Sequence, residues 1–207
     1  MIDRLRVAVI GCGMIANSAH FPALNILREK GEIEVVGVAD IRPEAAKETA
    51  ERHNVPKWYV DPQQMLDELY PDFVAVCTPN MHHKEWTIKA LKAGAHVACE
   101  KPMAISLADA KEMWQTAKEC DKMLFPCQCM RWRNYMQQSK ILVDSGELGD
   151  VYFSDIEFIR RIGIRCSKGN RTDIRISTIS VLCLCRRIIR LSRGLTAKTA
   201  VFTAMTV

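Results

Sequence analysis

Short apolar runs alternate with amphipathic stretches along the first 128 residues of the chain. The apolar runs predict strands at Leu5–Ile10, Ile33–Asp40, Lys57–Val60, Phe73–Cys77, Ala95–Glu100 and Lys122–Cys127. The stretches between them have helical spacing and predict helices at Met14–Glu29, Pro43–His53, Pro62–Leu69, Lys84–Ala93 and Leu107–Cys120. Strands and helices that alternate with short connections predict an α/β fold, a doubly wound parallel sheet with helices on both faces.

A glycine-rich turn, Gly11-Cys12-Gly13-Met14-Ile15-Ala16, joins the first predicted strand to the first helix. Gly11 would permit the tight turn, Gly13 would let the backbone approach a pyrophosphate, and Ala16 would allow close helix–strand packing. The phosphate would lie at the helix N-terminus. All six residues are therefore candidate cofactor contacts in a Rossmann domain, although a turn that only packs remains the alternative.

Asp40 ends the second predicted strand, where a dinucleotide site needs an acid. Its carboxylate would accept hydrogen bonds from the adenosine ribose hydroxyls and repel a 2′-phosphate, which favours NAD as the cofactor. Arg42 follows two residues later and could reach a 2′-phosphate, so NADP stays open. A solvated aspartate at a strand end is the alternative interpretation.

Glu100-Lys101-Pro102 closes the fifth predicted strand. Ligands of open α/β sheets bind beyond the carboxyl ends of the strands, so Lys101 is expected at the mouth of a site. A nucleotide cradle and a lysine at a strand end together indicate redox chemistry on a small molecule.

With these motifs the chain resembles the Gfo/Idh/MocA oxidoreductases, named for glucose–fructose oxidoreductase and inositol dehydrogenase. The resemblance covers roughly residues 4–159. It rests on the glycine turn, Thr78-Pro79-Asn80, His83, Glu85, Ala93-Gly94-x-His96-Val97, Glu100-Lys101-Pro102, Arg131 and Gly146-Glu147-Leu148-Gly149.

The resemblance implies roles for several of these positions. Lys101 would be the catalytic lysine beside the nicotinamide, and His83, rather than an exposed His82, would be the second catalytic candidate near the nicotinamide end. Thr78, Pro79 and Asn80 would line the edge of the cofactor site, and Glu100 would help to position the cofactor. Arg131 is grouped with the cofactor-site residues. Two other roles stay open for it: it could face the substrate, or it could pair with an acid at the domain junction.

The cysteines and the hydropathy limit the class of protein. The nine cysteines are an odd, scattered set that is typical of reduced thiols, and the chain shows no apolar run of transmembrane length and no signal-like segment. We therefore expect a cytoplasmic protein with no membrane partner. Cys127-x-Cys129 and Cys183-x-Cys185 have the wrong spacing for zinc, and no metal site is predicted.

The charge reverses sign along the chain, whose net charge is +5. Residues 160–207 carry 11 Lys and Arg against one acid, Asp173, and residues 162–207 contain no histidine, glutamate, proline or tryptophan. The prediction is a cofactor domain at 1–128, a junction and the start of an α+β substrate domain at 129–161, and an anomalous basic tail at 162–207, disordered or non-native. The histidine, commonly four residues after an aspartate, that relatives carry in their substrate domain is absent, which suggests a frame-shifted, truncated and inactive chain.

The resemblance implies an NAD(P)-dependent dehydrogenase or reductase acting on a hydroxyl or carbonyl of a sugar, cyclitol or related polyol. NAD-dependent glycoside cleavage is an alternative. So are a non-enzymatic nucleotide-binding protein with a basic arm and an interaction subunit that binds no nucleotide. No nucleic-acid partner is expected, because the tail lacks interleaved aromatic residues and recognition motifs. Intact relatives would form homo-oligomers, which is doubtful for this chain.

Overall fold

The computed structural model describes residues 4–156, 180–185 and 200–203. The chain forms two units, Met1–Gln128 and Cys129–Val207, and each is considered by itself. The expectations for residues 157–179, 186–199 and 204–207, which hold most of the basic tail, fall outside the described residues.

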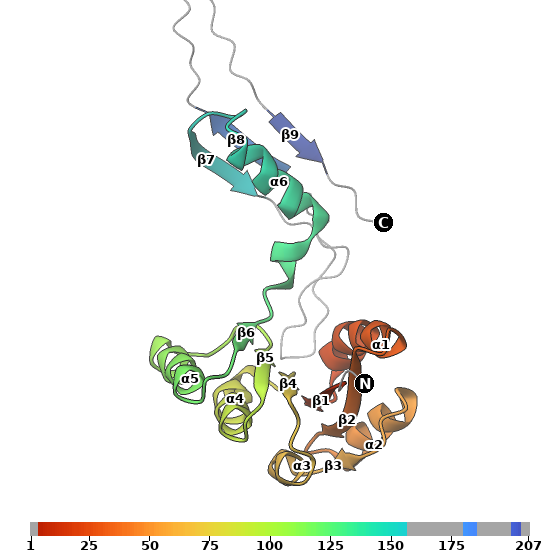
Figure 1. The fold of residues 1–207 in the computed structure, drawn as a ribbon. Helices are drawn as coiled ribbons and strands as arrows, with labels where there is room; N and C mark the ends of the chain where they lie inside the picture. Colours follow the sequence, from red (N-terminus) through yellow and green to blue (C-terminus); the bar gives the residue numbers. More distant parts are fainter. Residues whose placement is uncertain (1–3, 157–179, 186–199, 204–207) are drawn as a thin grey trace, which may run out of the picture. The chain divides into compact units, whose positions relative to one another are not determined.

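A six-stranded, all-parallel sheet organises the first unit (Figure 1). Its strands are β1 (Leu5–Ile10), β2 (Ile33–Ala39), β3 (Trp58–Tyr59), β4 (Phe73–Val76), β5 (His96–Cys99) and β6 (Leu124–Pro126). Their order across the sheet is β3-β2-β1-β4-β5-β6, which is the order of dinucleotide-binding doubly wound folds. The order reverses between β1 and β4, where such folds hold their ligand.

Helices cover the two faces of this sheet with separate apolar cores. On one face lie α1 (Phe21–Glu29) and α2 (Pro43–Arg52), and on the other lie α3 (Pro62–Leu69), α4 (His83–Lys92) and α5 (Leu107–Glu119). Both cores form because successive side chains of a strand point to opposite faces of the sheet. In β1, Val7 and Val9 pack in the core beneath α1 and α2, whereas Ala8 and Ile10 pack in the core beneath α3, α4 and α5. The doubly wound α/β fold predicted from the sequence is confirmed.

Capping residues fix several helix boundaries. Asp61 begins α3 by accepting a hydrogen bond from the Gln63 N–H at 2.8 Å, and Pro62 supplies the first helical residue. Ser106 begins α5 in the same way, since its hydroxyl accepts from the Asp109 N–H at 3.1 Å. These local signals explain why the predicted helix starts lie close to the observed ones.

The first predicted helix differs from expectation in its opening turns. A π-helical segment, η1 (Ala16–His20), precedes α1, and the Phe21 N–H bonds to the Ala16 carbonyl across the wide turn. Pro22 follows and has no N–H to continue an α-helical pattern. The Asn17 side-chain amide also donates to the Cys12 and Gly13 carbonyls at 3.1 and 3.0 Å, which ties the segment to the glycine turn.

The second unit contains a short 3₁₀ segment, η3 (Cys129–Trp132), the helix α6 (Asn134–Asp144) and a three-stranded antiparallel sheet. Its strands β7 (Val151–Ile156), β8 (Ser180–Cys185) and β9 (Ala200–Thr203) pair in chain order. The tail therefore contributes two strands, β8 and β9, to the described part of the chain. The assignment of residues 129–161 to a substrate domain stays a prediction.

Candidate active site

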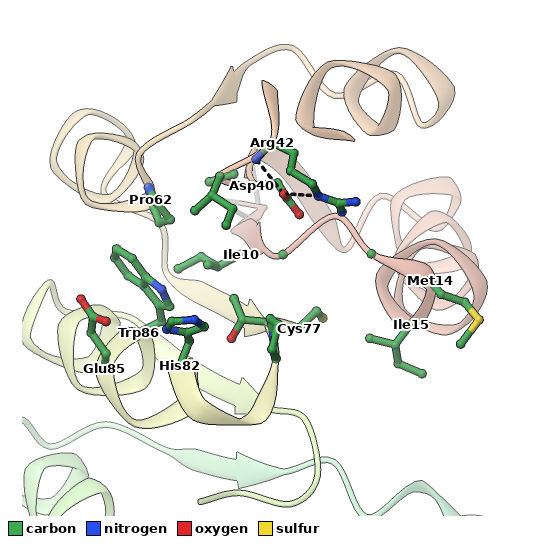
Figure 2. A pocket seen from close by; sticks show the side chains of 16 residues that line it. Ile10, Met14, Ile15, Asp40, Arg42, Pro62, Cys77, His82, Glu85 and Trp86 are labelled. Carbon is green, nitrogen blue, oxygen red and sulfur yellow. Dashed lines mark hydrogen bonds and ion pairs between the residues drawn. The ribbon is translucent and has the colours of Figure 1, made fainter. Parts of the chain in front are cut away.

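A cavity of about 420 Å³ opens at the carboxyl ends of the central strands (Figure 2). Its walls come from five segments: the turn after β1, the end of β2, the first residue of α3, the residues after β4, and the start of α4. The lining residues are Ile10, Gly11, Gly13, Met14, Ile15, Ala39, Asp40, Ile41, Arg42, Pro62, Cys77, Thr78, Pro79, His82, Glu85 and Trp86. The cavity therefore lies at the switch point of the sheet, between the ends of β1 and β4.

The two glycines of the turn serve different purposes. Gly11 has φ +97°, and a Cβ there would lie 2.7 Å from both the carbonyl carbon and the oxygen of Cys77. A Cβ on Gly13 would meet no atom within 4 Å. Gly11 is thus needed to pack β1 against β4, whereas Gly13 leaves its backbone open to a group entering the cavity.

Asp40 stands at the end of β2 with its carboxylate only 10% exposed. One oxygen accepts the Cys12 N–H at 2.9 Å, and the other accepts the Arg42 N–H at 2.9 Å and the Arg42 Nε–H at 3.2 Å. Burial alone would raise the pKa of Asp40, but these hydrogen bonds outweigh it, and the pKa is lowered from its ordinary value. The carboxylate is therefore ionised and fixed, and one of its roughly four lone-pair sites is left to accept a hydroxyl group (Figure 2).

Thr78, on the opposite wall, holds an unpartnered polar atom. Its hydroxyl oxygen is buried and has no hydrogen-bond partner within the part of the chain that the structure describes. Buried polar atoms without a partner are uncommon, but this oxygen has almost no exposed surface and does not itself face the cavity, although other atoms of Thr78 line it. The open backbone at Gly13 and the ionised Asp40 fit a dinucleotide with its phosphates and ribose.

Of the two adjacent histidines, His82 is exposed as expected, whereas His83 does not line the cavity. His83 begins α4 and is buried at 1% exposure, with Nδ1 2.8 Å from the Pro102 carbonyl and Nε2 2.9 Å from the Thr78 carbonyl. His82 is exposed and lines the cavity. The side chain of His83 thus joins two backbone turns around the cavity, and His82 is the histidine that meets the space itself.

The remaining candidates lie around rather than in the cavity wall. Cys12 and Ala16 are buried in the packing of the turn, where burial raises the pKa of the Cys12 thiol to about 12. Asn80 begins the 3₁₀ turn η2 (Asn80–His82) and is exposed. Glu100 and Lys101 follow β5, the first buried and the second exposed, and the Lys101–Pro102 peptide bond is cis.

Arg131 belongs to the second unit, where it lies in η3. Its carbonyl accepts a hydrogen bond from the Gln137 side chain at 2.6 Å. Its assignment to the cofactor site stays a prediction.

Several lining residues were missed by sequence reasoning. Ile41, Pro62 and Trp86 add apolar surface to the lining. His82 and Glu85 lie on the same side of the cavity as Trp86 (Figure 2). Three of them had a local signal: Ile41 directly follows Asp40, Glu85 is among the residues that carry the family resemblance, and Trp86 directly follows Glu85. Pro62 had none, since it serves equally as the first residue of α3.

A family model described as the oxidoreductase family with an NAD-binding Rossmann fold, GFO_IDH_MocA, matches residues 5–127. The chain belongs to the Gfo/Idh/MocA family. It is 38% identical to D-glucoside 3-dehydrogenase of Escherichia coli over 77% of this chain and 45% of that protein. It is 31% identical to myo-inositol 2-dehydrogenase of Thermotoga maritima over 70% of this chain and 42% of that protein.

A solved structure of the same family shares the fold. The WlbA dehydrogenase of Chromobacterium violaceum, in complex with NADH and UDP-GlcNAcA, superposes with a TM-score of 0.70 and 32% identity over 75% of this chain and 44% of that chain. The chain thus spans slightly less than half the length of the family members that it matches. Among the described residues, no helix is long and apolar enough to cross a membrane.

Proposed function

We propose that the first unit binds NAD(H) in the cavity and places Lys101 for hydride transfer between the nicotinamide and a hydroxyl or carbonyl carbon of a small polyol. The observation that carries the proposal is the arrangement around the switch point, where an open glycine backbone and an ionised aspartate meet in one cavity. The bound nicotinamide would supply the hydride chemistry, and the residues of the chain would bind and orient it.

NAD is favoured over NADP by the pairing of Asp40 with Arg42. The Arg42 side chain is 64% exposed, and its Nε–H is directed to the Asp40 carboxylate. A negative charge beside the ribose repels a phosphate and accepts hydroxyl hydrogens. The pair therefore supports discrimination against NADP.

Lys101 lies two residues past the end of β5, at the same edge of the sheet as the cavity. An ammonium group there would hydrogen-bond the reacting oxygen and stabilise the negative charge that develops on it. The buried Glu100 holds the start of this turn, because its carboxylate accepts the Lys101 N–H at 3.2 Å. This bond fixes the backbone at Lys101.

The substrate, the compartment and the assembly are part of the same proposal. The relatives' names, a glucoside dehydrogenase and an inositol dehydrogenase, support a sugar or cyclitol substrate. The thiols of Cys12, Cys77, Cys99, Cys120 and Cys129 are free, which supports a reducing, cytoplasmic setting. We further propose that full-length relatives act as homo-oligomers.

Replacing Lys101 by alanine tests the catalytic assignment. In this chain, Lys101→Ala is expected to change NADH affinity by less than about threefold, because Lys101 does not line the cavity. In a full-length relative, the matching substitution is expected to lower turnover by at least about 100-fold at nearly unchanged cofactor affinity. Steady-state kinetics and an NADH titration measure the two effects, and unimpaired turnover would refute the role.

A further inference from the structure

Three side chains from distant parts of the sequence meet beside the ends of β5 and β6. His20 ends η1, Glu100 follows β5, and Cys127 follows β6. Their nearest ligand atoms, an imidazole nitrogen, a carboxylate oxygen and a thiol sulfur, all lie within 4.8 Å of one another. Within this set, His20 Nε2 lies 2.8 Å from Glu100 Oε1. None of the three lines the cofactor cavity.

We propose that His20, Glu100 and Cys127 bind one divalent ion of the zinc class. Nitrogen, oxygen and sulfur are the three ligand types of zinc in proteins, and three protein ligands leave a fourth position for water. The thiolate selects against Mg²⁺ and Ca²⁺, which prefer oxygen ligands only. The proposal goes beyond the cofactor function and does not depend on it.

The geometry needs only a small adjustment to accept the ion. In tetrahedral coordination with bonds of about 2.1 Å to nitrogen and oxygen and about 2.3 Å to sulfur, ligand atoms lie roughly 3.4–3.7 Å apart. The His20–Glu100 separation of 2.8 Å would therefore open, and the sulfur would close from within its present 4.8 Å. Both changes are within the reach of side-chain rotation, and the ion would replace the proton that His20 now donates to Glu100.

The backbone around the three ligands is already fixed. The Cys127 N–H donates to the Cys99 carbonyl at 2.8 Å, and the Glu100 N–H donates to the Val76 carbonyl at 3.0 Å. Glu100 is 9% exposed, so its carboxylate is largely withdrawn from water. A partly desolvated carboxylate on a rigid backbone favours ion binding, because little order must be created when the ion arrives.

Cobalt substitution in the full chain without cofactor tests the site. Co²⁺ is expected to bind once per chain and to give thiolate-to-metal charge-transfer absorption in the near ultraviolet. Cys127→Ser should remove that band and weaken Zn²⁺ binding, measured by chelator competition, by at least about 10-fold. Cys129→Ser, the matched control two residues away on an exposed side chain, should keep both.

Two further variants test the other ligands, with circular dichroism verifying that each one is folded. His20→Asn and Glu100→Gln should each weaken Zn²⁺ binding by at least about 10-fold, since each variant replaces one of the three proposed zinc ligands. The proposal is overturned if the wild-type chain shows no charge-transfer band, or if the band survives Cys127→Ser. Equal loss in Cys129→Ser would likewise overturn it, because the ion would then be held by the Cys127-x-Cys129 pair.

Discussion

Replacement of Gly11 by alanine is expected to destabilise the cofactor unit by about 3–5 kcal/mol, enough to unfold much of it under mild conditions. Two costs add at this position. The backbone has φ +97°, which side chains with a Cβ rarely adopt, and the new methyl would overlap the Cys77 carbonyl group at 2.7 Å. The obstructing atoms belong to the backbone of Cys77, directly after β4, so a change of side-chain rotamer cannot relieve the clash. Urea unfolding followed by circular dichroism measures the loss.

Gly13→Ala is the matched control for that experiment. A Cβ there meets no atom within 4 Å, so stability should change by less than about 1 kcal/mol. NADH affinity should nevertheless fall by at least about 10-fold, because the methyl occupies the space into which the pyrophosphate fits. Equal stability losses in the two variants would contradict the separate roles assigned to the two glycines.

Replacement of Asp40 by alanine is expected to weaken NADH binding by about 10- to 100-fold, the value of one hydrogen bond to a charged acceptor. The affinity for NADPH should rise at the same time, because the repelling charge is lost and Arg42 is released from its 3.2 Å contact. The preference for NADH over NADPH should therefore fall by on the order of 1,000-fold. Parallel fluorescence titrations with the two cofactors give this ratio.

Arg42→Ala is the control that separates the two contributions of Asp40. Arg42→Ala alone should leave NADH affinity nearly unchanged. Combined with Asp40→Ala, it should cancel the gain in NADPH affinity that Asp40→Ala gives by itself. An undiminished preference for NADH in Asp40→Ala would contradict the assignment of Asp40 to the ribose site.

The lowered pKa of Asp40 also has a consequence for stability. A carboxylate whose pKa is depressed in the folded state stabilises that state above its ordinary pKa of about 3.9, and the contribution is lost as the pH falls through the lowered value. The difference in unfolding free energy between the wild type and Asp40→Ala should therefore be full at pH 7 and shrink below about pH 4.

The fold could be predicted almost completely, because local and global signals agree along the first 128 residues. Every predicted strand and helix there has a counterpart, and the errors concern boundaries. The strand predicted at Lys57–Val60 is only β3 (Trp58–Tyr59), since it lies at the sheet edge with β2 as its one neighbour. The wide turn of η1 could not be predicted, because it depends on Asn17 bonds to the preceding turn.

The candidate site could be predicted where a residue's role follows from its place at a strand end. Gly11, Gly13, Asp40 and Thr78 are of this kind, and all four line one cavity. Prediction failed where orientation depends on tertiary contacts: the sequence cannot show that the Pro102 and Thr78 carbonyls hold the His83 ring inward. The set of His20, Glu100 and Cys127 was invisible for the same reason, since its members come from three separate segments.

The most direct test of the central claim is a titration of the full chain with NADH, followed by the fluorescence of the bound cofactor. We expect saturable binding of one NADH per chain, weaker binding of NADPH, and NADH binding at least about 10-fold weaker in Gly13→Ala. Absence of saturable NADH binding in a chain whose circular dichroism shows the folded α/β unit would contradict the account.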